Sequence, residues 1–414
     1  MTISALTVEN FKGIADQTIF KVRPITIFVG ANSSGKSSCI HALACLSQTV
    51  KLGDASAPLV LDNENAQVHL GRFIEIVHSK SYSDPISLGI SAGNIEIQLG
   101  KEPINGEVSG AYTFKSTKRT QEISLAKVTL KIGMRTLEIS PRKGGGYKVI
   151  DSAAPSFVHE AAHVGGFSFM LTTPKKPTPE WLETFFVIRG VQEHIEKQLR
   201  KTLYLGPFRR PPARRYPFRG SLPSEVGAQG EEAIALLAHE SVQPKKRPHT
   251  MRVAKWLKEL GLAKLVGVSR LGASDLFDVS ITLEDDAALP IADLGYGLSQ
   301  ILPVLAQCSF APIGATLLFE QPELHLHPGA ARKLARVFVD AVTEKKINIV
   351  AETHSQDLLV AMITELKEKR LTLADIVAYE VKRIGGKSVY REITFTQDGD
   401  DFEADHPWFK SLEN

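Results

Sequence analysis

One stretch near the N-terminus carries the residue types of a nucleotide-phosphate site. Residues 25–29 form an apolar, β-prone run, and residues 30–37, with the sequence GANSSGKS, complete the pattern G-x-x-x-x-G-K-[ST]. Residues 37 to about 48 then have the pattern of a helix, so the loop lies between a strand and a helix, as this motif requires. The sequence therefore predicts a loop that binds the phosphates of a nucleotide.

The residue types in this loop follow from the chemistry of phosphate binding. Two glycines let backbone N–H groups turn toward an anion, and the helix that follows adds the positive end of its dipole. Lys36 is expected to bridge the β- and γ-phosphates, and the hydroxyl of Ser37 is expected to bind Mg²⁺. The loop residues expected to bind ATP are Gly30, Asn32, Ser33, Ser34, Gly35, Lys36, Ser37 and Ser38.

Two polar residues outside the loop are further candidates for the nucleotide site. Lys12 lies in a turn after an alternating segment and is expected to meet a phosphate, the alternative being an exposed turn lysine beside a packed Phe11. Gln67 precedes the apolar residues 73–77 and is a candidate for sensing Mg²⁺ and water, whereas a lone glutamine in a loop is more often only solvated.

The second half of the chain supplies candidate catalytic side chains at the ends of two apolar runs. Residues 315–319 form a β-prone run that ends at Glu320, and a carboxylate delivered in this way normally supplies the second Mg²⁺ contact of P-loop enzymes. Residues 347–351 form another run, which is followed by His354. A histidine at the end of a parallel strand can reach a γ-phosphate and its attacking water.

A second anion-binding element is expected directly before the helical residues 301–308. Gly295, Gly297 and Ser299 belong to the sequence LGYGLSQ, and small residues at a helix N-terminus form a nest for an anion. If this nest serves a phosphate held by another subunit, the active site is shared across a dimer.

Composition gives the chain the character of an ordinary globular protein. Its 414 residues favour two to three domains. The charge, with 49 basic against 46 acidic residues, is too balanced to indicate nucleic-acid binding by itself. No apolar run is long enough to span a membrane and no signal peptide is visible, so a cytoplasmic protein without membrane contact is expected. Cys39, Cys45 and Cys308 lack metal-like spacing and are expected to be reduced core residues.

The middle of the chain combines strands, a helix and a cluster of basic and aromatic residues. Residues 86–150 have the pattern of antiparallel strands, expected at residues 86–90, 95–99, 123–132, 136–139 and 147–150. Residues 180–201 have the pattern of an amphipathic helix. The cluster that follows could contact DNA, line a nucleotide site or form a protein interface. Its arginines are Arg209, Arg210, Arg214, Arg215 and Arg219.

Together these motifs carry a family resemblance. The order of phosphate loop, glycine turn, acidic strand and Thr-His-Ser resembles the ABC-type ATPase heads of the SMC, RecF and OLD group. The sequence EQPELHLHP at residues 320–328 is most similar to stand-alone bacterial AAA-family ATPases, such as ATPase subunits of anti-phage defence systems. The fold implied is α/β: an ABC-type P-loop head with a mixed sheet flanked by helices, an antiparallel β-rich insertion and a helical subdomain.

The resemblance also implies an organisation for the chain. It predicts an N-terminal lobe at residues 1–85, a β-rich insertion at 86–200 and a C-terminal lobe at 201–414. It implies an ATPase using ATP and Mg²⁺, and a homodimer or higher homo-oligomer in which Gly295, Gly297 and Ser299 act in trans. A separate effector, a nuclease or toxin, would read the closure and reopening of this dimer.

One departure from the family pattern concerns hydrolysis. ABC ATPases usually place Asp then Glu at the end of the acidic strand, whereas this chain has Glu320 followed by Gln321. A carboxamide can orient water but cannot take its proton at neutral pH, so turnover is expected to be slow or to use another base. The candidates are Glu323, Glu352 and His354. Two other functions remain open, a DNA-repair ATPase acting directly on DNA and a nucleotide-loaded scaffold.

Overall fold

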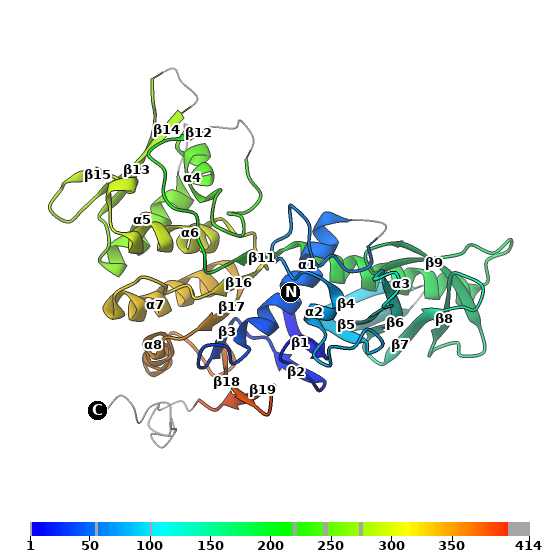
Figure 1. Cartoon of the computed structure of the whole chain (residues 1–414). Coiled ribbons are helices and arrows are strands. Elements are labelled where there is room, and N and C mark those ends of the chain that lie inside the picture. The colour runs from blue at the N-terminus through cyan, green and yellow to red at the C-terminus, as the bar shows by residue number, and fades with distance from the viewer. Residues whose placement is uncertain are drawn as a thin grey trace. The chain divides into compact units, whose positions relative to one another are not determined.

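The computed structural model describes residues 2–53, 57–99, 102–217, 222–242, 247–272 and 276–395, which form two compact units (Figure 1). The first unit comprises the described residues within 1–22, 33–202 and 382–389, and the second those within 23–32, 203–381 and 390–414. Each unit is therefore built from segments that are distant in sequence, and the phosphate loop contributes residues to both.

A nine-stranded antiparallel sheet is the framework of the first unit. Its strand order is β10-β9-β8-β7-β6-β5-β4-β1-β2. The strands are β1 (Ile3–Glu9), β2 (Thr18–Lys21), β4 (Ile86–Leu99), β5 (Glu102–Ser116), β6 (Ile123–Ile132), β7 (Arg135–Pro141), β8 (Tyr147–Asp151), β9 (Val158–Gly165) and β10 (Ser168–Leu171). The predicted antiparallel strands are thus confirmed. Because β1 pairs with β4, the strand-rich segment continues the N-terminal strands in one sheet. The division at residues 85 and 200 stays a prediction.

Two details of this sheet differ from the sequence-based expectation. Residues 86–90 and 95–99, expected as separate strands, form the single strand β4, whose pairing register with β5 shifts between Ala92 and Asn94. The whole of β5 was not predicted, because Pro103 and two glycines interrupt its alternation of apolar residues. Pairing with both β4 and β6 supplies the order that its local sequence does not.

Three helices belong to the first unit: α1 (Lys36–Leu52), α2 (Phe73–Ile76) and α3 (Pro179–Arg200). Thr178 caps α3 by accepting a hydrogen bond from the Trp181 N–H at 3.3 Å, and Pro179 begins the helix, where its missing N–H has no cost. The Ser47 hydroxyl of α1 donates to Leu199 O, at the end of α3, at 2.8 Å. The predicted helix at residues 180–201 is confirmed.

The helix α3 also closes one edge of the nine-stranded sheet. In the terminal strand β10, the N–H of Phe169 donates to Gln192 Oε1 at 2.7 Å, and Gln192 Nε2 donates to Phe169 O at 2.8 Å. A side-chain amide therefore takes the hydrogen bonds that another strand would make at this residue.

The second unit is organised around a six-stranded sheet of order β11-β16-β17-β3-β18-β19. The strands are β3 (Ile25–Val29), β11 (Thr202–Leu205), β16 (Thr316–Glu320), β17 (Asn348–Thr353), β18 (Ile376–Ile384) and β19 (Lys387–Ile393). The pairs β16/β17, β17/β3 and β3/β18 are parallel, so the carboxyl ends of these strands meet at one edge. This arrangement confirms the predicted α/β class.

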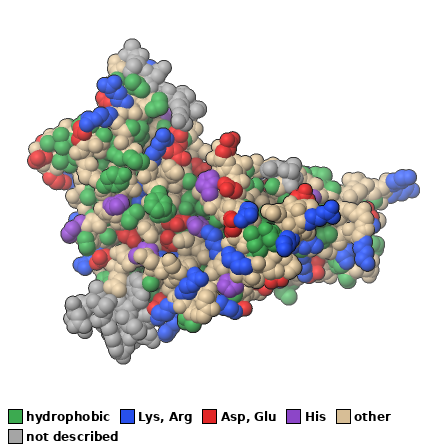
Figure 2. Space-filling model, viewed as in Figure 1, with side chains coloured by type: hydrophobic (Ala, Val, Ile, Leu, Met, Phe, Trp, Pro, Cys, Tyr) green, Lys and Arg blue, Asp and Glu red, His purple; other side chains and the backbone are tan. Residues whose placement is uncertain are grey.

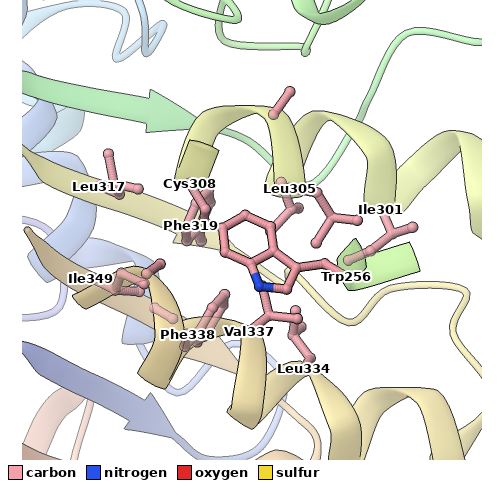
Figure 3. Packing of buried hydrophobic residues seen from close by; sticks show 14 of the residues in the cluster. Trp256, Ile301, Leu305, Cys308, Leu317, Phe319, Leu334, Val337, Phe338 and Ile349 are labelled. Atoms are coloured by element: carbon pink, nitrogen blue, oxygen red, sulfur yellow. The ribbon is translucent and has the colours of Figure 1, made fainter. Parts of the chain in front are cut away.

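Helices and a smaller sheet complete the second unit. The helices are α4 (Ala233–Ser241), α5 (Pro248–Leu260), α6 (Tyr296–Phe310), α7 (Pro328–Lys345) and α8 (Gln356–Lys367), with a 3₁₀ turn, η1 (Ile291–Asp293). The smaller sheet contains β12 (Tyr216–Pro217), β13 (Leu265–Arg270), β14 (Leu276–Thr282) and β15 (Ala288–Pro290). The fully buried Trp256 packs among residues of α6, α7 and the six-stranded sheet (Figure 3).

Alternation along β16 separates this core from the acidic end of the strand. Leu317 and Phe319 belong to the apolar core, and the Phe319 ring stacks on Phe338 of α7 at 5.7 Å. Glu320 follows on the opposite face of the strand, because successive side chains point to opposite faces.

All three cysteines are buried and free, as expected. Among the described residues, no helix has the length and apolarity needed to cross a membrane.

Candidate functional site

In the first unit, the phosphate loop leads into the N-terminus of α1. Gly35 precedes the helix with φ 105°, a left-handed conformation that favours glycine. The first turn has no acidic residue and no side-chain cap, and it contains the buried Lys36. The buried Ser34 Oγ has no hydrogen-bond partner among the described residues. A buried cation in a first helical turn that lacks acidic residues fits a bound phosphate, so these residues suit the ATP that the motif predicts.

The other predicted residues of the first unit have identifiable surroundings. Lys12, at φ 50°, places Nζ 2.5 Å from Nδ1 of His41 on α1. Gln67 is half-buried in a bend, and its role in metal sensing stays a prediction. The nearby loop is instead anchored by Gln48 of α1, whose Nε2 donates to Val60 O at 2.7 Å. Neither His41 nor Gln48 was predicted, because each lies inside a helix whose sequence gives no hint of these distant partners.

A residue near the far end of the chain also holds the phosphate loop. The Ser388 hydroxyl donates to Ser34 O at 2.7 Å, and the Ser388 N–H donates to Gly13 O at 2.8 Å. A side chain at Gly13 would meet Ser388 Oγ at 2.1 Å, so this close approach requires glycine. Sequence reasoning missed Ser388 because nothing in its neighbourhood resembles a nucleotide motif.

In the second unit, the start of the phosphate loop faces the turn after β16. Gly30, Ala31 and Asn32 line a cavity of about 730 Å³ together with two later segments, residues 321–331 and 354–357. Its lining includes three of the five candidate catalytic residues: Gln321, Glu323 and His354. The structure thus brings together side chains from three separate stretches of sequence.

The fourth catalytic candidate, Glu320, is buried at the end of β16 with 5% of its surface exposed. The hydroxyl of Tyr204, on β11, donates to Glu320 Oε1 at 2.7 Å. Burial, with the Glu320 and Glu352 carboxylates nearby, raises the pKa of Tyr204 well above its ordinary value, so this hydroxyl stays a proton donor. Glu352 pairs in register with Glu320, which places the two carboxylates on one face of neighbouring strands.

The backbone of Gln321 turns sharply after β16. Its φ of 46° lies in the left-handed region, which is unfavourable for a residue with a Cβ. The Gln321 N–H donates to Glu352 O at 3.0 Å, and Arg209 Nη2 donates to Gln321 O at 3.1 Å. The conformation of Gln321 is therefore held from both sides of the residue.

Glycine at position 321 should stabilise the protein, because it removes the Cβ that makes this φ unfavourable. We expect the free energy of unfolding of Gln321→Gly to rise by about 1 kcal/mol, measured by urea denaturation. Gln321→Ala is the matched control, since it shortens the side chain but keeps the Cβ. An equal gain in both variants would contradict a backbone origin.

Glu323 connects this turn to the histidine segment after β17. The Thr353 hydroxyl donates to Glu323 Oε1 and accepts a hydrogen bond from the Ser355 N–H at 2.8 Å. Burial raises the pKa of the Glu323 carboxyl above its ordinary value, although the Thr353 hydrogen bond opposes the shift. Its Oε2 is buried without a hydrogen-bond partner among the described residues.

His354 is oriented by the first glycine of the phosphate loop. Its Nδ1 lies 3.1 Å from Gly30 O. A carbonyl oxygen can only accept a hydrogen bond, so Nδ1 carries the proton and Nε2 is the acceptor nitrogen of the neutral ring. The ring lies in the wall of the cavity, and its contact with a γ-phosphate stays a prediction.

The glycine turn expected to act in trans begins α6, with Gly295 as its N-cap. Ser299 is buried, and its hydroxyl donates to Tyr296 O in its own helix at 2.8 Å. A Cβ on Gly297 would lie 2.8 Å from His325 O, so glycine is required here by packing within the chain. A contact of Gly295, Gly297 or Ser299 with a phosphate of a second subunit stays a prediction.

The arginine cluster considered for DNA divides into different environments. Arg209 is only 5% exposed and donates to backbone carbonyls, so of the three alternatives for the cluster its burial favours an internal role over DNA contact. Arg214 is exposed but pairs with Asp293 at 2.5 Å. Arg210 and Arg215 are exposed, whereas Arg219 lies outside the described residues. On the face drawn in Figure 2, basic and acidic side chains are intermixed.

Three solved SMC heads are similar to most of the chain. The SMC head domain from Thermotoga maritima is 10% identical, covers 95% of this chain and 100% of its own, and has a TM-score of 0.44. An SMC head bound to the C-winged helix domain of ScpA is 11% identical, covers 95% and 98%, and has a TM-score of 0.47. A third, with an extended coiled coil and bound to the C-terminal domain of ScpA derived from Pyrococcus furiosus, is 9% identical, covers 100% of both chains, and scores 0.44.

Two family models match separate parts of the sequence. A model described as an AAA ATPase domain matches residues 1–129, which contain the phosphate loop. A model described as an AAA domain, putative AbiEii toxin, Type IV TA system matches residues 269–361, which contain the glycine turn, the acidic strand and the histidine. No curated protein sequence is significantly similar to the chain.

Proposed function

From the two matching AAA ATPase models we propose that the chain is an SMC- and RecF-like AAA ATPase, in which ATP binding and hydrolysis drive a conformational switch for a separate effector protein. The observation that carries the proposal is the opening of α1, where the left-handed Gly35 and the buried Lys36 support an anion site. Two such chains close around ATP as a homodimer, and hydrolysis reopens them.

ATP and Mg²⁺ fit the donor groups of the site. Lys36 and the N–H groups at the start of α1 bind the phosphates, and oxygen ligands from Ser37 and Glu320 suit Mg²⁺. When bound, Mg²⁺ neutralises negative charge that develops on the phosphates. Tyr204 keeps one oxygen of Glu320 hydrogen-bonded and so orients this carboxylate. Lys12 remains a proposed contact to a phosphate, and Gln67 remains a proposed contact to the metal.

We assign the proton transfer of hydrolysis to His354 rather than Gln321. The Gln321 amide orients water but cannot accept its proton, whereas Nε2 of the neutral His354 ring can. Glu323 supports this role because it holds Thr353, the residue before His354. Turnover with His354 as the base is expected to be slow. His354 stands at the position that normally contacts the γ-phosphate, and Gln321 stands at the usual position of the base.

The setting proposed for this switch is bacterial anti-phage defence, with a nuclease or toxin as the effector. Its support is the resemblance of residues 320–328 to ATPase subunits of defence systems, together with the family description that mentions a putative toxin. Expressing the chain with its genomic neighbours and measuring plaque formation tests the setting. Unchanged plaque formation with every phage tested would contradict the defence role.

ATP should change the oligomeric state if the switch operates by dimer closure. We expect light scattering to show a shift from the chain mass of 45.3 kDa, or a multiple of it, to a larger species when ATP and Mg²⁺ are added. ADP with Mg²⁺ is the control for binding without a γ-phosphate. No change in mass or in hydrodynamic radius with ATP would contradict the switch.

The presence of Gln321 favours a second candidate function, a scaffold that binds ATP but hardly hydrolyses it. In that case ATP keeps the dimer closed until a partner completes the site. Sustained phosphate release by the purified chain would exclude this scaffold.

A further inference from the structure

Arg209 belongs to the arginine cluster in sequence, but its environment is that of an internal residue. Resting on the proposed ATPase, we propose that Arg209 is a positioning residue of the hydrolytic site, which fixes the turn carrying Glu320 and Gln321. Neither the nucleotide motifs nor the family matches assign it this role.

The contacts of Arg209 are directed at the backbone of that turn. One guanidinium nitrogen, Nη2, donates to Glu320 O at 3.2 Å and to Gln321 O at 3.1 Å. These are the carbonyls of the proposed metal ligand and of the proposed water-orienting amide. Because a guanidinium is planar and charged, it can hold two neighbouring carbonyls at once and more strongly than a neutral donor.

The turn needs such a restraint because its backbone is strained. Gln321 adopts φ 46°, and an unfavourable conformation persists only where the surroundings determine it. The Gln321 N–H is held by Glu352 O, so Arg209 supplies the restraint on the carbonyl side. Without it, relaxation of φ would change the direction of the Gln321 side chain.

Arg209 also acts from the same segment as Tyr204. Tyr204 holds the Glu320 side chain, and Arg209, five residues later, holds the Glu320 main chain. One short stretch beginning in β11 therefore fixes both the carboxylate and the turn that follows it. This pairing explains why a large cation is buried at the end of a sheet that already has an apolar core.

Burial of this guanidinium is costly, which indicates that it is not there for stability alone. Its Nε and Nη1 are buried without hydrogen-bond partners among the described residues. Burial lowers the pKa of Arg209 to about 10, so it remains charged at neutral pH, with Glu323 as the opposing charge. Two roles for the cation must therefore be separated: positioning the turn and neutralising Glu323.

The first test compares Arg209→Met and Arg209→Lys with Arg210→Met, an exposed neighbour and matched control. We expect Arg209→Met to lower kcat for ATP by about ten- to a hundredfold, while the Kd for ATP stays within about threefold. Arg209→Lys should recover part of kcat, because an ammonium keeps the charge and can donate to these carbonyls, but its protons are not fixed in direction as those of a guanidinium are. Arg210→Met should match the wild type.

The second test separates positioning from charge compensation. If Arg209 only neutralises Glu323, adding Arg209→Met to Glu323→Gln should leave the kcat of Glu323→Gln unchanged. Under the positioning role, the double variant regains thermal stability relative to Arg209→Met, but its kcat falls again by about tenfold or more below that of Glu323→Gln. Equal kcat values for the double variant and Glu323→Gln would overturn the proposal.

Each outcome bears on one proposal or the other. A wild type and an Arg210→Met variant that neither bind ATP nor release phosphate would refute the ATPase itself. A wild type that turns over ATP beside an Arg209→Met variant with the same kcat would refute only the positioning role. If the wild type binds ATP without turnover, the same comparisons are made in the Gln321→Glu background, with the same expected ratios.

Discussion

Replacing Lys36 by alanine is expected to abolish ATP turnover and to weaken ATP binding strongly. Lys36 is buried in the first turn of α1, and it is the cation that we propose binds the β- and γ-phosphates. Loss of one preorganised charge at such a site typically lowers the rate by roughly 100- to 1,000-fold. Phosphate release and equilibrium binding of a fluorescent ATP analogue measure the two effects.

A control is needed because the loop also has structural contacts. Lys51 lies in the last turn of the same helix, far along the chain from the loop, so Lys51→Ala preserves the site while removing a lysine from α1. We expect Lys51→Ala to keep wild-type turnover. Wild-type phosphate release by Lys36→Ala, with a normal melting temperature, would contradict the assignment of the phosphate loop.

The second large effect is expected for Glu320→Gln. This change keeps the size of the side chain and an oxygen that accepts the hydrogen bond from Tyr204, but it removes the charge that we propose binds Mg²⁺. We expect kcat to fall by roughly 100-fold or more, since the metal stabilises charge in the transition state. The required concentration of Mg²⁺ should rise in parallel, which a titration of turnover against Mg²⁺ measures.

Gln321→Glu is the natural comparison, because it restores the carboxylate of the usual base. Faster turnover than the wild type would mean that Gln321 limits hydrolysis. If the wild type binds ATP without turnover and only Gln321→Glu hydrolyses it, the protein is a latch that awaits a trigger. Full activity of Glu320→Gln would instead remove Glu320 from the metal site.

Much of the nucleotide machinery could be predicted because its signals are local. The phosphate loop places its glycines, lysine and serine within eight consecutive positions, residues 30–37, between a strand and a helix. The acidic strand and the histidine each follow an apolar run, and parallel pairing of β16, β17 and β3 brings their ends to one edge. Strand ends in a parallel sheet must meet, so the cavity could be anticipated in outline.

The supporting residues could not be predicted because their partners are remote. Arg209 contacts Glu320 and Gln321 more than a hundred positions later, and Ser388 contacts a loop at the other end of the chain. The sequence around Arg209 instead favoured a surface cluster, since arginines beside aromatics are common at interfaces. Only burial distinguishes Arg209 from its exposed neighbour Arg210.

The strand-rich segment shows a second limit of local patterns. Strands β9 and β10 escaped prediction, because their short runs include glycine, histidine and exposed apolar residues. Strand β5 is stabilised by pairing with its two neighbours rather than by its own composition. Strand propensity depends strongly on such context. Where the alternation of apolar and polar residues is weak, pairing with neighbouring strands therefore determines whether a segment forms a strand.

The amide of Gln192 at the rim of the large sheet has a consequence for how the protein behaves at high concentration. Open strand edges are templates on which further chains can assemble into aggregates. Gln192 occupies both hydrogen-bonding groups of Phe169, in a strand of only four residues, and so blocks growth of the sheet at that rim. At this rim, the large sheet is thus protected against adding strands from further chains.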